Sequence, residues 1–487
     1  MNSTSSSSFN YFRVSLCTFS LWLAGIAAAF AQTNGTPWTS QFITNYVSPI
    51  VGGTPDTVAV WYGNRVAIVV DPQSSLPSPN YATMTNIAFA FDNLYTAYDQ
   101  VTGQTPLTGN YLLNGKIRVE FTTNMPSGVA GTASANSGYY GIAVGNGFMV
   151  NSKELYARYN QGITTVDQAM FYESQRDYWT PLFNTRIDYA TLTQPPGRAN
   201  PNSWGWWTVG FNNAMSVFMS QGVIAGVTNM YYYGQNAQQF AAGMTANLTT
   251  YTNNPGLYNF TNSWCTDWVP WSIPGNPTSV NDLMTATLID MYNHYGGLLF
   301  LSNLYREIPR SAPVPGWPND ITTACNNFYA AASRAAGTNL ISYFTNVLRW
   351  PITPGFDYQT VYPMVYWNGG VSTAWSNVNN WTGAAVVPNA TNVIAFTGSS
   401  NTIVDLHGNQ SIYMLTFDPL ANATFTVGNS VVGTALTIAS NGAILKLANN
   451  ISILNQIIAT PIVLAGDATF GNQSDWVQDR QLIIELD

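Results

Sequence analysis

The chain has 487 residues, of which 46% are hydrophobic and only 8% are charged. An ordinary soluble domain carries about 25% charged residues, so water must be met here mainly by Asn, Thr, Ser, Gln and Tyr side chains. The hydrophobic content excludes a disordered protein. A net charge of -8 with only 15 Lys and Arg leaves no basic surface for nucleic acid or an anionic membrane, so we expect neither partner.

The N-terminus predicts an exported protein. A polar lead containing Arg13 precedes an apolar run over residues 14–30, and Ala29-Phe30-Ala31 has the small residues of a cleavage site. We interpret residues 1–31 as a signal peptide, which makes the mature chain secreted or attached to the cell surface. No later stretch approaches about 20 uninterrupted apolar residues, so no transmembrane helix is expected in the mature chain.

The cysteines fit an exported protein. Cys17 would leave with the signal peptide, and Cys265 and Cys325 then become candidates for a disulfide, because export leads to an oxidising environment. Two separate buried thiols are the alternative. Two histidines and two cysteines are too few for a zinc site built from these ligands, so no cofactor is expected and zinc least of all.

The spacing of apolar residues predicts two domains, 32–362 and 363–487. In the first, Gly63-Asn64 separates two β-rich runs and predicts a hairpin. A helix follows over 80–98, and then comes a strand over 116–121 whose alternation places Glu120 on a face in water. Beyond Trp350 short β runs recur at intervals of about eight to twelve residues. That spacing favours stacked coils, and hence a β-solenoid.

Residues 164–179 read as the central helix of the first domain, with Thr165 and Gln168 as a capping box. Tyr172, Glu173 and Arg176 take the three chemical positions of the zinc-protease pattern His-Glu-x-x-His. In that pattern two histidines hold zinc on one helix face and the glutamate acts as a base toward the metal-bound water. In this chain the glutamate alone remains.

The order of several segments around this helix resembles secreted gluzincin-like metallopeptidases of the enhancin and mucin-degrading type, over about residues 80 to 352. The segments are the central helix, the helix after Ser203-Trp204-Gly205-Trp206-Trp207, Leu288-Ile289-Asp290-Met291-Tyr292 with Tyr295-Gly296-Gly297, and residues 331–340 with Trp350-Pro351. The resemblance implies an α+β zincin-like domain that acts on glycoproteins, with Glu173 as the catalytic residue. The family's two zinc histidines align with Tyr172 and Arg176.

These two replacements argue against zinc hydrolysis, because arginine stays protonated and offers no lone pair to a metal. Two interpretations remain open. In one, Glu173 and Arg176 form a structural ion pair at i, i+3 in place of the metal charge. In the other, Tyr172, Arg176 and Asp177 line a metal-free pocket in which Arg176 binds an anionic or carbonyl ligand and Glu173 works as a base.

A second group of candidate ligand-binding residues is the tryptophan cluster. Trp204, Trp206 and Trp207 could stack on sugar rings, since apolar rings with N–H edges suit the faces of carbohydrates. The alternative is a corner of the core. A glycan or glycoprotein is therefore the partner that we weigh for this domain.

The entry to the second domain contains Trp367-Asn368, Trp375-Ser376-Asn377, Asn379-Asn380-Trp381 and Pro388. Together with the strands that follow, this stretch resembles the autotransporter-associated β-strand repeat of bacterial exported proteins, over about residues 366 to 471. The resemblance implies an all-β right-handed β-solenoid that serves as a display stalk.

These observations predict an exported bacterial binding or display protein, in which a catalytically degenerate metallopeptidase-like domain precedes a β-solenoid. A hydrolase that uses Glu173 on glycoprotein or cell-wall material is the first alternative. A purely structural surface protein is the second. Whether any catalysis survives is left open by the sequence.

Overall fold

The computed structural model describes part of the chain. The described residues are 40–48, 52–70, 81–104, 106, 112–122, 131–133, 147–151, 165–178, 183, 186–187, 206–224, 227–232, 235–265, 280–312, 321–362, 364–382, 387–396, 401–417, 423–428, 433–446, 455–472 and 482–484. The predicted signal peptide, residues 1–31, lies outside them. Within the described part, no helix is long and apolar enough to cross a membrane.

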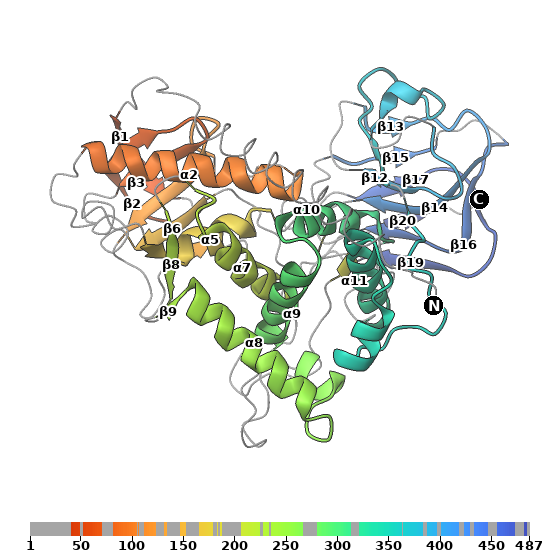
Figure 1. Cartoon of the computed structure of the whole chain (residues 1–487). Coiled ribbons are helices and arrows are strands. Elements are labelled where there is room, and N and C mark those ends of the chain that lie inside the picture. The colour runs from red at the N-terminus through yellow and green to blue at the C-terminus, as the bar shows by residue number, and fades with distance from the viewer. Residues whose placement is uncertain are drawn as a thin grey trace, which may run out of the picture.

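A six-stranded sheet of mixed orientation begins the fold, with strand order β1-β2-β3-β4-β6-β5. Its strands are β1 (Ser40–Ser48), β2 (Gly52–Tyr62), β3 (Val66–Val70), β4 (Ile117–Thr122), β5 (Gly131–Ala133) and β6 (Gly147–Asn151). The predicted hairpin is confirmed, because β2 and β3 pair antiparallel with Tyr62 opposite Ala67. The predicted helix is confirmed as α2 (Tyr81–Thr102), which runs along the sheet in Figure 1.

The expectation that Glu120 faces water is wrong. Ile117 and Val119 of β4 belong to the main core, while Arg118 and Glu120 on the opposite face are each only 6% exposed. The hydroxyl of Tyr46 on β1 donates a hydrogen bond to Glu120, and the ring of Tyr46 lies 5.6 Å from the guanidinium of Arg118. The alternation of β4 was predicted correctly, but β1 covers the second face.

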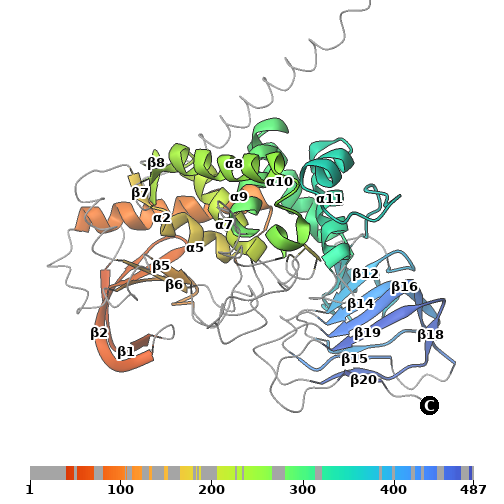
Figure 2. The same cartoon turned by 90° about the horizontal axis from the view of Figure 1, so that it is seen from below.

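Helices form the larger part of the structure between residues 165 and 350 (Figures 1 and 2). The elements are β7 (Thr165–Asp167), α5 (Ala169–Arg176), α7 (Trp206–Met219), β8 (Asn229–Tyr232), β9 (Gln235–Asn236), α8 (Ala237–Asn253), η3 (Phe260–Trp264), α9 (Val280–His294), α10 (Leu298–Glu307), η4 (Ile308–Arg310), α11 (Ile321–Ala336) and η5 (Tyr343–Val347). Helix α7 approaches α9 closely at Gly210, where a Cβ would lie 2.5 Å from Cβ of Met284. A larger residue at position 210 would therefore push these two helices apart.

Aromatic side chains fill the centre of this helical part. Trp207 is 1% exposed and stacks on Trp350 with ring centroids 5.0 Å apart. Phe328 meets Trp207 edge-on at 5.3 Å, and Trp264 meets Trp350 edge-on at 5.0 Å. Such ring pairs stabilise a core beyond the area that they bury. They bring α7, η3 and α11 together around Trp350, where the helical part ends.

The predicted disulfide is absent from the structure, and this expectation is wrong. Cys265 and Cys325 are both buried, but they are not joined. Burial raises the pKa of the Cys265 thiol to about 12, so the thiol stays protonated and unreactive at neutral pH. The alternative of two separate buried thiols is the correct one.

The C-terminal part contains two further sheets. The larger has the order β11-β10-β12-β14-β16-β18, and β19 also pairs with β16; the smaller has the order β13-β15-β17-β20. Their strands are β10 (Met364–Trp367), β11 (Trp381–Thr382), β12 (Val393–Phe396), β13 (Ile403–Val404), β14 (Gln410–Phe417), β15 (Thr426–Val427), β16 (Leu436–Lys446), β17 (Gln456–Ile458), β18 (Ile462–Leu464), β19 (Ala468–Asn472) and β20 (Leu482–Ile484). One η6 turn (Val378–Asn380) precedes β11.

The predicted fold class is wrong. Instead of an α+β zincin-like domain followed by an all-β right-handed β-solenoid, the described residues form a mixed α/β structure with several small sheets of mixed orientation. In the larger C-terminal sheet β10 pairs antiparallel with β11 and parallel with β12. Short apolar runs and turn residues recur at the same spacing for both strand directions, so the pattern found the strands but could not assign how they pair.

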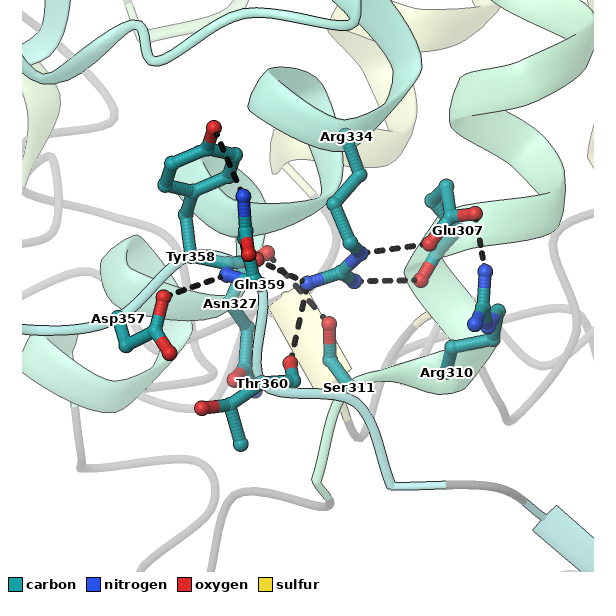
Figure 3. Close-up of polar contacts among 9 residues, drawn as sticks. All are labelled: Glu307, Arg310, Ser311, Asn327, Arg334, Asp357, Tyr358, Gln359 and Thr360. Carbon is teal, nitrogen blue, oxygen red and sulfur yellow. Dashed lines mark hydrogen bonds and ion pairs between the residues drawn. The ribbon is translucent and has the colours of Figure 1, made fainter.

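A buried arginine fastens the segment that joins the helical part to the C-terminal sheets (Figure 3). Nε of Arg334 on α11 lies 2.6 Å from a carboxylate oxygen of Glu307 on α10. Nη1 of Arg334 donates hydrogen bonds to the carbonyl oxygens of Tyr358 and Thr360 at 2.8 and 3.2 Å. The Arg334 side chain is 10% exposed, whereas Arg310, which pairs with the same glutamate, is 48% exposed. Arg334 on α11 therefore binds both helix α10, through Glu307, and the connecting segment, through the carbonyls of Tyr358 and Thr360.

We predict that Arg334→Gln lowers the free energy of unfolding by about 2 to 4 kcal/mol, because Glu307 and two carbonyl groups lose a shared, largely buried donor. Arg310→Gln is the matched control and should change it by less than about 1 kcal/mol, as expected for an exposed ion pair. Urea unfolding measures both variants, and equal losses would contradict the anchoring role of Arg334.

Candidate functional site

The central helix is shorter than the sequence predicted. Residues Thr165–Asp167 form β7, which pairs parallel with β8, and α5 begins at Ala169. The backbone of Thr165 thus belongs to a sheet, and Gln168 at the N-cap makes no side-chain cap, so the predicted capping box is wrong. Instead, the Gln168 amide donates a hydrogen bond to Asn213 on α7 at 2.8 Å. A strand pairing that is distant in sequence overrides the local helix signal here.

Glu173 and Arg176 form the ion pair that the sequence suggested. Nη1 of Arg176 lies 3.1 Å from Oε2 of Glu173. The Glu173 side chain is 6% exposed, and the Arg176 side chain is 29% exposed. The carboxylate therefore lies on the buried side of α5, and its charge is balanced by a guanidinium that reaches toward the surface.

Tyr172 stands beside this pair and is half-buried. Burial raises the pKa of its phenol to about 12; Arg176 acts in the opposite direction, and Glu173 raises the pKa further. The phenol is therefore protonated at neutral pH.

The zinc that the sequence resemblance implied does not fit these residues. A protonated phenol and a guanidinium stand at the two histidine positions, and neither offers the lone pair of an imidazole. The glutamate between them is already engaged by Arg176 at 3.1 Å. Among the described residues, no group of three or more His, Cys, Asp or Glu side chains could hold a metal ion.

Asp177 interacts electrostatically with Arg176 but lies deeper in the protein. It is fully buried, and its Oδ2 accepts a hydrogen bond from the Tyr95 hydroxyl on α2 at 2.6 Å. Burial raises the pKa of Asp177 to about 8, and the hydrogen bond from Tyr95 opposes that rise. Its geometry joins α5 to α2, so Asp177 belongs to the core behind the helix.

Of the three tryptophans in the predicted cluster, the structure describes the side chain of Trp207 alone. Trp207 lies in the core against Trp350, so its ring is not available to a sugar. Trp206 is the first residue of α7, and its side chain lies outside the described part of the structure, as does Trp204. For Trp207 the core interpretation is the one that the structure supports.

Sequence reasoning missed Tyr232, which joins this region through strand pairing. It ends β8, the partner of β7, and an electrostatic interaction with Tyr232 adds to the rise that burial causes in the pKa of Tyr172. Its side chain is 36% exposed and packs edge-on against Phe240 at 5.3 Å. About 60 residues separate Tyr172 and Tyr232, and no spacing rule links residues that far apart. We call Tyr172, Arg176 and Tyr232 the tyrosine–arginine patch.

Comparison with known proteins identifies no family. No protein-family model and no curated protein matches the sequence. A conserved protein of unknown function from Bacillus anthracis str. Ames, solved as a mutant, is similar in structure with a TM-score of 0.36 and 12% identity, over 61% of this chain and 50% of that one. Yeast LTA4 hydrolase in complex with bestatin gives a TM-score of 0.30 and 10% identity, over 66% of this chain and 46% of that one. The chain thus spans about half the length of these two solved chains.

We predict that Glu173→Gln lowers the free energy of unfolding at pH 7 by about 1 to 3 kcal/mol, because it leaves the Arg176 charge beside a buried neutral amide. The double variant Glu173→Gln, Arg176→Met should recover part of that loss, since it removes the uncompensated charge as well. Chemical denaturation measures the three proteins. Unchanged stability in Glu173→Gln would show that the ion pair has no structural role.

Proposed function

We propose that this chain is an exported binding or display protein, and that its α5 helix is a structural element with no zinc chemistry. The observation that supports this proposal most is the ion pair at 3.1 Å between Arg176 and the buried carboxylate of Glu173. A general base must be able to reach a proton on water or substrate. Here Glu173 would be the base, but its side chain is buried and its charge is balanced by Arg176.

The tyrosine–arginine patch is the part of this region that a ligand would meet. Arg176 and Tyr232 are both partly exposed, and Tyr172 interacts electrostatically with each of them. A tyrosine offers an apolar ring with a polar tip, and a guanidinium offers several hydrogen-bond donors. This combination suits a hydroxyl-rich ligand such as a glycan, which we propose as the partner, in agreement with the expected export of the chain.

A glycan array with the purified mature chain tests this proposal. We expect binding to a limited set of glycans, and we expect Tyr232→Ala to weaken that binding at least about fivefold, because aromatic anchors carry much of the energy at such contacts. Phe42→Ala is the matched control, since Phe42 is 77% exposed on β1, which does not belong to the patch. That variant should bind like the unmodified chain.

A peptidase assay can contradict the proposed function. Hydrolysis of a glycoprotein substrate that a chelator abolishes, and that Glu173→Gln also abolishes, would overturn the proposed function. Glycan binding that both Tyr232→Ala and Phe42→Ala leave unchanged would instead remove the patch as the binding site.

A further inference from the structure

Three carboxylates and two cations lie around the contact between α2 and α5, and two of the carboxylates are paired. Nη1 of Arg65 lies 2.6 Å from Oδ2 of Asp99, and Arg176 pairs with Glu173. Asp99 also accepts a hydrogen bond from the Tyr178 hydroxyl at 2.5 Å. Both cations are therefore engaged in ion pairs, and Asp177 is the remaining acid. Burial raises the pKa of Asp177, Glu173 raises it further, and the charge of Arg176 lowers it.

The position of Asp177 disfavours a negative charge. Its residue is 0% exposed, and its Oδ2 accepts one hydrogen bond, from Tyr95. Its Oδ1 is buried and has no hydrogen-bond partner in the described structure. An ionised carboxylate in such a place loses its hydration without enough donors to replace it, so the group neutralises by holding its proton.

Among the described residues, α7, β5 and β6 supply no further cation to α5. Helix α5 packs against α7, β5 and β6 as well as α2, and the sequences of those three elements carry no charged residue. The Tyr305 hydroxyl on α10 is bound by Gln175 of α5 at 2.6 Å. The titratable and charged groups that face this contact are Arg65, Tyr95, Tyr98, Asp99, Glu173, Arg176, Tyr178 and Tyr305.

We propose that Asp177 is a neutral carboxylic acid at neutral pH, and that its proton keeps α5 packed against α2. We call this protonated contact between Asp177 and Tyr95 the lock. Removal of that proton at alkaline pH would place an unpaired charge between the two helices. The lock therefore makes the seating of α5, which carries Tyr172, Glu173 and Arg176, sensitive to alkaline conditions.

The direction of the pH dependence follows from the raised pKa. Burial raises the pKa of Asp177 to about 8 in the folded chain, while an unfolded Asp titrates near about 3.9. The folded state thus holds a proton that the unfolded state has lost. Its contribution to stability is complete below pH 4, falls as the pH rises toward 8, and is absent above that value.

The first test compares thermal unfolding of Asp177→Asn and the unmodified chain between pH 4.5 and 9.5. The unmodified chain should lose at least about 3 °C in Tm relative to Asp177→Asn between pH 4.5 and 8, and the difference should then level off. Asp357→Asn is the matched control, since Asp357 is exposed and an amide keeps the hydrogen bond to the Gln359 backbone. A constant difference between Asp177→Asn and the unmodified chain would overturn the proposal.

The second test needs no variant to fold. The infrared spectrum of the unmodified chain should contain a protonated-carboxyl C=O band at pH 7 that disappears by pH 10, because ordinary Asp and Glu side chains are already ionised at pH 7. Absence of the band at pH 7 would contradict a neutral Asp177. Loss of the band without faster hydrogen exchange in α5 would contradict the lock.

Discussion

The ion pair between Glu173 and Arg176 lies on a helix whose remaining residues are nearly all buried. Ala169, Met170, Phe171, Ser174 and Gln175 face other parts of the protein, and only the arginine and Tyr172 reach partway toward the surface. A buried carboxylate without a partner would cost several kcal/mol, so the arginine makes this position possible for a glutamate. The same contact engages the carboxylate that a general base would need free. The structural role of Glu173 and its proposed lack of a catalytic role therefore rest on one interaction.

Because charged residues are scarce, a few arginine side chains make many of the buried polar contacts. With 8% charged residues, some cations of the described structure bind several acceptors each. Arg349 donates hydrogen bonds to the backbone carbonyls of Tyr251, Thr252 and Tyr258, and Arg334 serves Glu307 and the connecting segment. A guanidinium suits this task because its five donors are held in a fixed plane. Asp177 responds differently to this shortage, because burial raises its pKa to about 8.

The sequence predicted local structure well wherever the signal was local. The Gly63-Asn64 turn, the periodicity of α2 and the helix expected at the tryptophan cluster all correspond to observed elements. Pairings between distant segments were beyond its reach. The parallel contact of β7 with β8 replaced the first turn of the expected helix, and the cover of β1 over Glu120 turned a solvated face into a buried one. Residue spacing carries no information on which strand lies beside which.

In the candidate site, too, contacts between residues close in sequence could be predicted, and contacts between distant residues could not. Glu173 and Arg176 are three residues apart on one helix, so their contact could be predicted, whereas Tyr232 interacts with Tyr172 electrostatically from a strand that no spacing rule links to α5. Trp207 shows the converse case. Its neighbours in sequence suggested a sugar-stacking surface, but its neighbours in space are Trp350 and Phe328.

The central claim is that Glu173 pairs with Arg176 on a helix that holds no zinc. A zinc-edge anomalous difference map from crystals of residues 32–487 grown with zinc tests this claim most directly. The account predicts no zinc peak beside Tyr172, Glu173 and Arg176, and an intact contact between Glu173 and Arg176. A zinc peak at this face of α5, with the Arg176 side chain displaced, would contradict it.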